Sequence, residues 1–208
     1  TCMLSAEWAE KLADEDLATC PNPDETFPLW FVPDELISVD TLRDLCMDTY
    51  AGTKYDSRES AYAGPFGNVL TGNYESRGTM VPQCTYFQCS NVKAWLPEEV
   101  RCLVWFGYGA TLTQYMTPVF ASSNCLDPKM YTGTRSEGWN PNSGWWNQEQ
   151  VQTAAMINCD DALKYIASIR EPLMTEQFET TAAIQNVAAA MIEAGNKEAA
   201  INLITTYQ

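Results

Sequence analysis

Residues 101–108 read RCLVWFGY, and this stretch decides the class of fold. Its β-branched and aromatic residues predict a strand. Leu103 and Trp105 point to one side of that strand, whereas Val104 and Phe106 point to the other. A strand that is apolar on both faces is normally covered on both, so we expect a layered sandwich rather than a half-exposed sheet.

Two neighbouring stretches have the composition of further strands. Residues 79–90 precede the central strand across a turn at Pro97-Glu98-Glu99, and residues 114–121 follow it. The sequence therefore predicts at least three strands, which we expect to pair in antiparallel fashion.

The N-terminal third shows helical periodicity in two places. One amphipathic helix is predicted over residues 3–20, ending before Pro21. A shorter helix is predicted from a cap at Ser38 or Asp40 through Tyr50. A long, glycine-punctuated, loop-like region follows it, and loops of this length inside a domain are usually functional.

The segment 148–208 is predicted to be helical throughout. A long helix should run to about residue 170 and break at Pro172, because proline lacks the backbone N–H that a helix interior needs. A second helix is predicted over about 176–194, closed by Gly195, and a last one over about 197–205. The expected class is α+β, with antiparallel strands followed by C-terminal helices.

Charge and hydropathy restrict the partners. The chain has 12 basic and 27 acidic residues, a net charge of −15, so its surface repels nucleic acids and anionic membranes. The longest apolar runs, such as 102–107 and 187–192, are far shorter than the ~20 residues that span a bilayer. We expect neither nucleic acid nor membrane as a partner.

Eight cysteines and no histidine restrict the chemistry. Without a Cys-x-x-Cys pair or a histidine, a zinc finger and a His-activated nucleophile are both excluded, and we expect no metal and no cofactor. So many cysteines favour several disulfides and a secreted or lysosomal protein; buried free thiols remain the alternative. Cys84 and Cys89 should point to opposite faces of one strand, where Cys102 could reach one of them.

A series of short motifs then follows in a fixed order. They are Pro33-Asp34, Ile37-Ser38-Val39, Tyr50, Gly52-Thr53, Tyr55-Asp56 and Ala63-Gly64-Pro65-Phe66-Gly67. With Trp95-Leu96-Pro97 and Val104-Trp105-Phe106-Gly107-Tyr108, the chain resembles the cysteine dipeptidase family of dipeptidase A and the secernins over about residues 27–170. It departs from that family at Ala51, at residues 57–60 and at residues 68–73, where substrate preference or activity itself could differ.

The resemblance implies a four-layer αββα N-terminal-nucleophile hydrolase fold, of which residues 1–208 would be the C-terminal portion of a single domain. In that family an N-terminal Cys, exposed by autoproteolysis upstream of the matched segment, attacks the substrate, and its own α-amino group is the base. The chain would then be the C-terminal chain of a processed dipeptidase that hydrolyses small peptides or amides through a thioester. Its partners would be the N-terminal chain of the same precursor and, optionally, further copies in a higher homo-oligomer.

Three other interpretations remain open. One is a non-catalytic storage or structural homologue that retains only the fold, and another is an acylase-type amidase with a non-peptide substrate. A nucleophile at Thr1, or at Cys2 after removal of Thr1, is the third, but a helical rather than a strand pattern follows both residues.

The same resemblance suggests the site residues. Arg77 matches a recurrent arginine of the family and would stabilise the oxyanion, although it could instead pair with Glu75. Gly64, Phe66 and Gly67 would let the backbone approach a peptide closely, or would simply form a tight turn. Asn68 and Asn73 would hydrogen-bond the termini of a dipeptide.

Overall fold

The computed structural model describes residues 32–53, 55–72 and 78–208. The chain divides into two compact units, residues 1–42 and 43–208, and the sheet lies in the second. The predicted helix over 3–20, with Thr1, Cys2 and Cys20, lies outside the described residues. Asn73, Glu75 and Arg77 also lie outside them.

Helix α3 (Val39–Cys46) begins where the sequence predicts it. The Ser38 hydroxyl accepts a hydrogen bond from the Thr41 backbone N–H at 3.0 Å, so Ser38 rather than Asp40 caps the helix. The helix ends at Cys46 rather than at Tyr50, whose positive φ of 60° is incompatible with a continuing right-handed helix.

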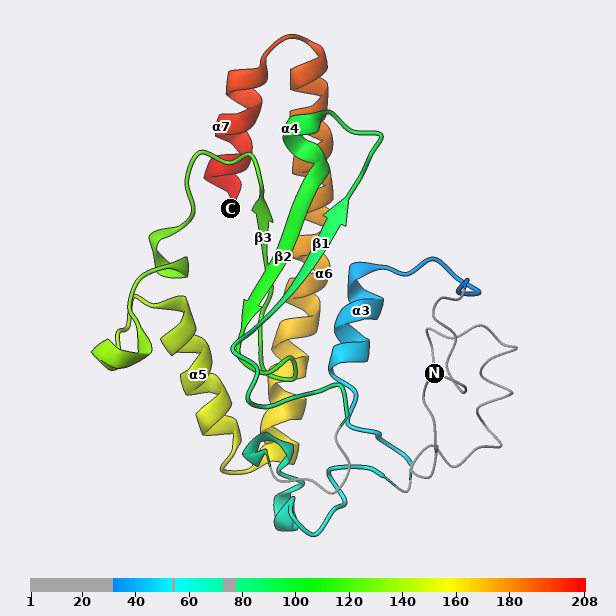
Figure 1. Ribbon diagram of the computed structural model, residues 1–208, viewed down its shortest axis with the longest axis vertical. Coiled ribbons are helices and arrows are strands. Elements are labelled where there is room, and N and C mark those ends of the chain that lie inside the picture. Colours follow the sequence, from blue (N-terminus) through cyan, green and yellow to red (C-terminus); the bar gives the residue numbers. More distant parts are fainter. Residues whose placement is uncertain (1–31, 54, 73–77) are drawn as a thin grey trace, which may run out of the picture. The chain divides into compact units, whose positions relative to one another are not determined.

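Three antiparallel strands form one sheet in the order β1-β2-β3 (Figure 1). They are β1 (Tyr86–Val92), β2 (Cys102–Tyr108) and β3 (Thr117–Phe120). Trp105 of β2 lies opposite Cys89 on one side and Pro118 on the other. The central strand, the third strand and the antiparallel pairing are confirmed, whereas β1 begins seven residues later than predicted, at Tyr86 instead of 79.

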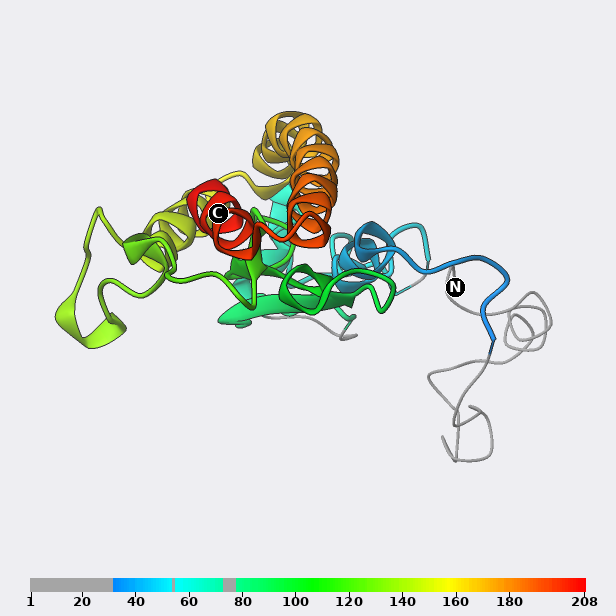
Figure 2. The same ribbon diagram turned by 90° about the horizontal axis from the view of Figure 1, so that it is seen from above.

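One face of the sheet is a buried core. Leu103, Trp105 and Phe120 are almost inaccessible, and the Trp105 ring meets Phe178 of helix α6 edge-to-face at 4.4 Å. Figure 2 shows α6 (Cys159–Glu193) and α7 (Lys197–Tyr207) together on this side of the sheet. The sheet and these two helices therefore form two layers.

The opposite face of the sheet is also apolar but much less buried. Phe106 stacks on Tyr86 at 5.6 Å and meets Tyr108 edge-to-face at 4.8 Å. Tyr86 and Val92 are 53% and 59% exposed, and the β2 side chains on this face are half-buried. The described residues thus bury one of the two faces that the sequence predicts to be covered.

The helix break predicted at Pro172 is wrong. Helix α6 runs through Pro172 without interruption, and the break lies earlier, between α5 (Gly144–Ala155) and α6. Arg170 and Met174, on either side of the proline, are 7% and 1% exposed. Their burial against the sheet side of the molecule compensates for the hydrogen bond that Pro172 cannot make.

Short helical turns complete the described fold. They are α4 (Glu98–Arg101), η2 (Gly64–Phe66), η3 (Val69–Thr71), η4 (Pro128–Met130) and η5 (Arg135–Glu137). The turn predicted at Pro97-Glu98-Glu99 is the start of α4. Among the helices described, none is long and apolar enough to pass through a bilayer.

The register corrects the cysteine prediction. Cys102 lies opposite Val92, whereas Cys89 lies opposite Trp105 and faces the other side of the sheet. Cys84 precedes β1 and lies at the end of the sheet opposite to Cys102. Cys102 therefore reaches neither residue, and the six cysteines of the described ranges are free thiols.

Candidate functional site

The motif Tyr50–Asp56 belongs to a loop, residues 48–58, that we call the motif loop. The Asp56 carboxylate is its centre: it accepts hydrogen bonds from the backbone N–H groups of Gly52 and Arg58, both at 3.0 Å. The Arg58 guanidinium donates to both oxygens of the same carboxylate, from Nε at 3.2 Å and from Nη2 at 3.0 Å. Such bidentate, charge-assisted pairing is the strongest kind of side-chain hydrogen bond.

The electrostatics of Asp56 follow from this geometry. The side-chain hydrogen bonds from Arg58, joined by the backbone donors, lower the pKa of Asp56 to about 2 although burial opposes them. Although Asp56 is only 6% exposed, this low pKa keeps it ionised inside the loop. The carboxylate is thus a fixed negative charge that organises the backbone around it.

Thr53 closes the same loop from within. Its hydroxyl donates to the Tyr50 carbonyl at 2.8 Å and accepts the Tyr55 N–H at 3.1 Å. The rings of Tyr50 and Tyr55 meet edge-to-face at 6.4 Å. Tyr50, Thr53 and Tyr55, which belong to the family motif, therefore stabilise the conformation of the loop.

Residues 78–80 lie against the beginning of the motif loop. Met80 N–H donates to the Asp48 carbonyl at 3.2 Å, and the Thr79 hydroxyl donates to the Leu45 carbonyl. A Cβ atom on Gly78 would lie 2.5 Å from the Asp48 carbonyl oxygen, so only glycine permits this approach. Arg77, the predicted oxyanion residue, is the residue before Gly78, and its role stays a prediction.

The turn at Gly64–Gly67 is tight and partly exposed. Gly64 and Gly67 have positive φ angles of 63° and 55°, and Phe66 is 51% exposed. A Cβ atom on Gly67 would lie 2.4 Å from an oxygen of Asp160, which belongs to the first turn of α6. The turn thus lies close to Asp160 at Gly67, whereas the expected approach of its backbone to a peptide stays a prediction.

Asn68 joins this turn to the helices. Its amide Nδ2 donates to the Met156 carbonyl at 2.7 Å, and its Oδ1 accepts the Leu70 N–H at 3.1 Å. Met156 lies in the break between α5 and α6, where the last carbonyls of a helix lack an intrahelical donor. The Asn68 amide supplies a donor to one of them. The predicted contact of Asn68 with a dipeptide terminus is not tested by this arrangement.

Asp160 lies against the Gly64–Gly67 turn, and its charge also acts on Arg58 of the motif loop. Arg58 has a raised pKa, first because of its bond to Asp56 and to a smaller extent because of the Asp160 and Glu59 carboxylates. Arg58 and Gly67 therefore share Asp160 as a neighbour. Sequence reasoning noticed Arg58 only as a departure from the family pattern and missed Asp160, which is distant in the chain.

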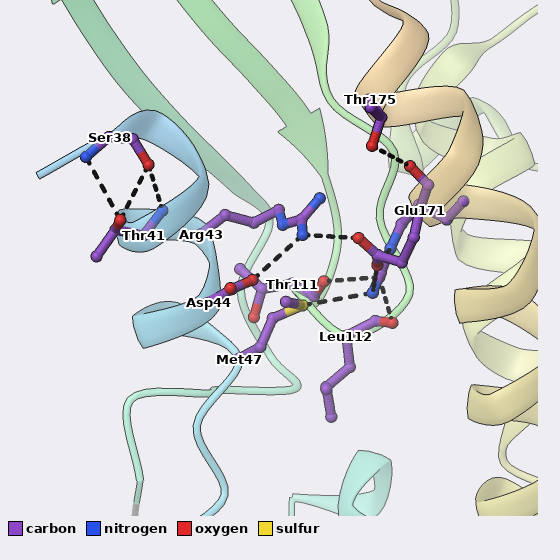
Figure 3. A network of polar contacts seen from close by, with 10 residues as sticks. Ser38, Thr41, Arg43, Asp44, Met47, Thr111, Leu112, Glu171 and Thr175 are labelled. Carbon is purple, nitrogen blue, oxygen red and sulfur yellow. Dashed lines mark hydrogen bonds and ion pairs between the residues drawn. The ribbon is translucent and has the colours of Figure 1, made fainter. Parts of the chain in front are cut away.

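A second polar network, drawn in Figure 3, lies next to the motif loop in the chain and includes Met47. Glu171 of α6 binds Arg43 at 2.7 Å through one oxygen and Arg170 at 2.7 Å through the other. Arg170 also donates to the Leu112 carbonyl at 2.7 Å and to the Met47 sulfur at 3.5 Å. Met47 directly precedes the motif loop.

Glu171 is held charged by its two arginines. Burial by itself raises the pKa of Glu171, but the hydrogen bonds and charges of Arg170 and Arg43 outweigh that effect and leave the pKa below its ordinary value. Arg43 and Arg170 are 5% and 7% exposed. No sequence pattern indicated this network, because Arg43 lies far from Arg170 and Glu171 in the chain.

Three of the described thiols are poor nucleophiles toward a substrate in solution. Burial raises the pKa of Cys159 and of Cys89, and burial followed by repulsion from neighbouring thiols raises that of Cys46. A thiol with a raised pKa is protonated near neutrality and reacts slowly. Within residues 32–53, 55–72 and 78–208, no group of three or more His, Cys, Asp or Glu is arranged to hold a metal ion.

Comparison with known proteins bears on this site as a whole. The family model described as Peptidase family C69 matches residues 13–171. This span covers more than half of the 208 residues and includes the motif loop, the glycine turn and the whole sheet. A search of curated proteins gave no match.

Proposed function

The chain belongs to peptidase family C69, and from that membership we propose that it is the C-terminal part of a cysteine dipeptidase. The observation that carries the proposal is the family match across residues 13–171, which contains every motif of the candidate site. The substrates proposed are small peptides or amides, and the nucleophile is an N-terminal Cys on another chain of the same precursor.

The chemistry available in this chain supports a nucleophile from elsewhere. The sequence contains no histidine to activate a thiol. Burial raises the pKa of the Cys46, Cys89 and Cys159 thiols, which makes them less reactive. An N-terminal Cys needs no histidine, because its own α-amino group removes the thiol proton. The thiolate would attack the scissile carbonyl, the amine would leave with that proton, and water would hydrolyse the thioester.

This chain would supply the walls of the site. Under the proposal, the guanidinium of Arg77 lies near the acyl carbon and stabilises the oxyanion as charge develops. The Gly64–Gly67 turn, Asn68 and Asn73 contact the peptide. Asp56 and Arg58 keep the motif loop in the conformation that completes the cleft, through the bonds described above.

The half-exposed face of the sheet, opposite α6 and α7, favours the presence of an additional chain. Tyr86, Phe106 and Tyr108 form an aromatic cluster there, and Tyr86 is 53% exposed. We propose that a second sheet from the N-terminal chain of the precursor packs on this face and produces the four-layer αββα sandwich. The two strands at the edges, β1 and β3, are then continued or protected in the assembly.

The complete precursor tests the proposal directly. After expression and purification, a second polypeptide that begins with Cys should accompany this chain, and the pair should hydrolyse dipeptides until the thiol is alkylated. An N-terminal residue other than Cys, with no hydrolysis, would indicate the non-catalytic homologue. Turnover of non-peptide amides alone would indicate an acylase-type amidase. A monomeric chain that folds cooperatively by itself would contradict the second chain.

A further inference from the structure

Three thiols gather beside the motif loop. Cys46 ends helix α3, two residues before Asp48, and Cys84 lies two residues before the start of β1. Cys89 lies within β1 and is buried on the helix-covered face. Cys84 and Cys89 are both close enough to Cys46 for their charges to act on its thiol.

Backbone contacts independently bring the segments of Cys46 and Cys84 together. The carbonyls on either side of Cys46, those of Leu45 and Asp48, accept hydrogen bonds from Thr79 and Met80. A turn closed by the Cys84 N–H and the Val81 carbonyl, at 3.0 Å, then returns the chain to Cys84. These hydrogen bonds hold the end of α3 next to the segment that leads into β1.

Exposure and register select the reactive pair. Cys46 and Cys84 are both half-buried, so an oxidant in solution reaches them, whereas Cys89 is buried in the core face. Cys102 lies on the other face of the sheet, opposite Val92, and is excluded by its position.

We propose that Cys46 and Cys84 are a redox-active pair that forms a reversible disulfide. Cys84 attacks a disulfide oxidant such as oxidised glutathione and releases one glutathione thiol; Cys46 then loses its proton, attacks the Cys84 sulfur and releases the second thiol, so that one S–S bond forms and the oxidant gains two electrons. The step at Cys46 is intramolecular, so proximity compensates for the small thiolate fraction that its raised pKa leaves. The bond closes a loop from residue 46 to residue 84, which contains the motif loop, the glycine turn and Gly78. Oxidation would therefore restrain the whole candidate site, independently of which substrate it binds.

The test uses the complete purified protein, with all chains of the precursor together, and needs no activity, so its outcome is separate from that of the proposed peptidase. The protein is incubated with oxidised or reduced glutathione, alkylated, and digested without reduction. Trypsin releases Cys84 and Cys89 on one peptide, because cleavage follows Arg77 and Lys93. Chymotrypsin, which cleaves after Tyr86 and Phe87, then separates the two cysteines before mass spectrometry.

The expected product is a cross-linked peptide pair that carries Cys46 and Cys84, present after oxidation and absent after reduction. Oxidation should raise the melting temperature by roughly 5–15 °C, as a cross-link closing a loop of this length does in a domain of this size. Cys84→Ser should abolish both effects, whereas Cys89→Ala should retain the cross-link. Bonding of Cys46 to Cys89, or alkylation of Cys46 and Cys84 after oxidation, would overturn the proposal.

Discussion

The sheet with its helices and the loops of residues 48–80 are held together by different forces. Trp105, Phe178 and Leu103 stabilise the first region by removing apolar surface from water. Asp56, Arg58 and Asn68 stabilise the second through hydrogen bonds and ion pairs to particular atoms. The first region tolerates changes of similar volume, whereas the second depends on single donors and acceptors.

Trp105→Ala should give the largest loss of stability. Removing a buried Trp side chain costs about 3–5 kcal/mol in the free energy of unfolding, because lost burial and a residual cavity add. Urea unfolding of the two proteins measures the difference. Phe106→Ala is the matched control on the opposite face, and in this chain alone it should cost less than half as much. Equal losses would show that both faces are already covered.

Arg77→Ala should separate activity from stability in the complete enzyme. Loss of one donor to a developing oxyanion lowers turnover by about 10²–10³. Arg77→Lys should restore only part of the rate, because an ammonium group lacks the planar fork of a guanidinium. Steady-state kinetics and melting temperatures are measured together. A lower melting temperature with unchanged kcat would remove Arg77 from the active site.

Arg170→Ala should test the network next to the motif loop. The substitution leaves the Leu112 carbonyl and one oxygen of Glu171 without their donor, and we expect a loss of about 2–3 kcal/mol. This figure is below that of a fully buried pair because Glu171 is partly exposed. Lys164→Ala removes a solvent-exposed pair with Asp161 and should leave the urea midpoint of unfolding unchanged within error. Similar values for the two variants would contradict the structural role of Arg170.

The pH dependence of unfolding should report Asp56. Its pKa is lowered from 3.8 to about 2 in the folded chain, so the unfolded state binds the proton more tightly. The stabilisation is complete above pH ~4 and is lost as the pH falls toward ~2, with an amplitude of about 1–2 kcal/mol. Urea titrations at several pH values compare the wild type with Asp56→Asn. A variant that loses stability over this range as steeply as the wild type would show that Asp56 is not the titrating group.

Asn68→Ser should give the smallest effect, about 1 kcal/mol, because it removes one donor from a backbone carbonyl. The serine hydroxyl can still accept the Leu70 N–H, whereas the amide that binds Met156 is lost. Asn68→Ala, which loses both bonds, should cost more. In the complete enzyme, a rise in KM well beyond this stability loss would support the predicted peptide contact. A variant as stable as the wild type would show that the Met156 bond contributes nothing.

The sequence was most informative where a periodic pattern met a regular element. The alternation in residues 102–108 predicted β2, and the Ser38 cap predicted the start of α3. The glycines at 64 and 67 indicated a tight turn, which their positive φ angles confirm. Local patterns report local conformation because the dihedral preferences and capping bonds that produce them involve near neighbours.

For the candidate site, the sequence identified the motif but not its connections. Asp56 was recognised as part of the motif, whereas its partner Arg58 and the neighbouring Asp160 were not. The contact of Asn68 with Met156 likewise depends on two segments that only folding brings together. No spacing rule predicts such a pair, since its members share neither a helix face nor a strand.

What the sequence by itself determined is the α+β class, the apolar character of both sheet faces and membership in family C69. Tertiary structure alone decided that α6 continues through Pro172, because burial of Arg170 and Met174 outweighs the missing hydrogen bond. It also decided that Cys102 lies opposite Val92 and that the end of α3 packs beside residues 79 and 80, because strand register and loop packing are set by contacts between distant residues.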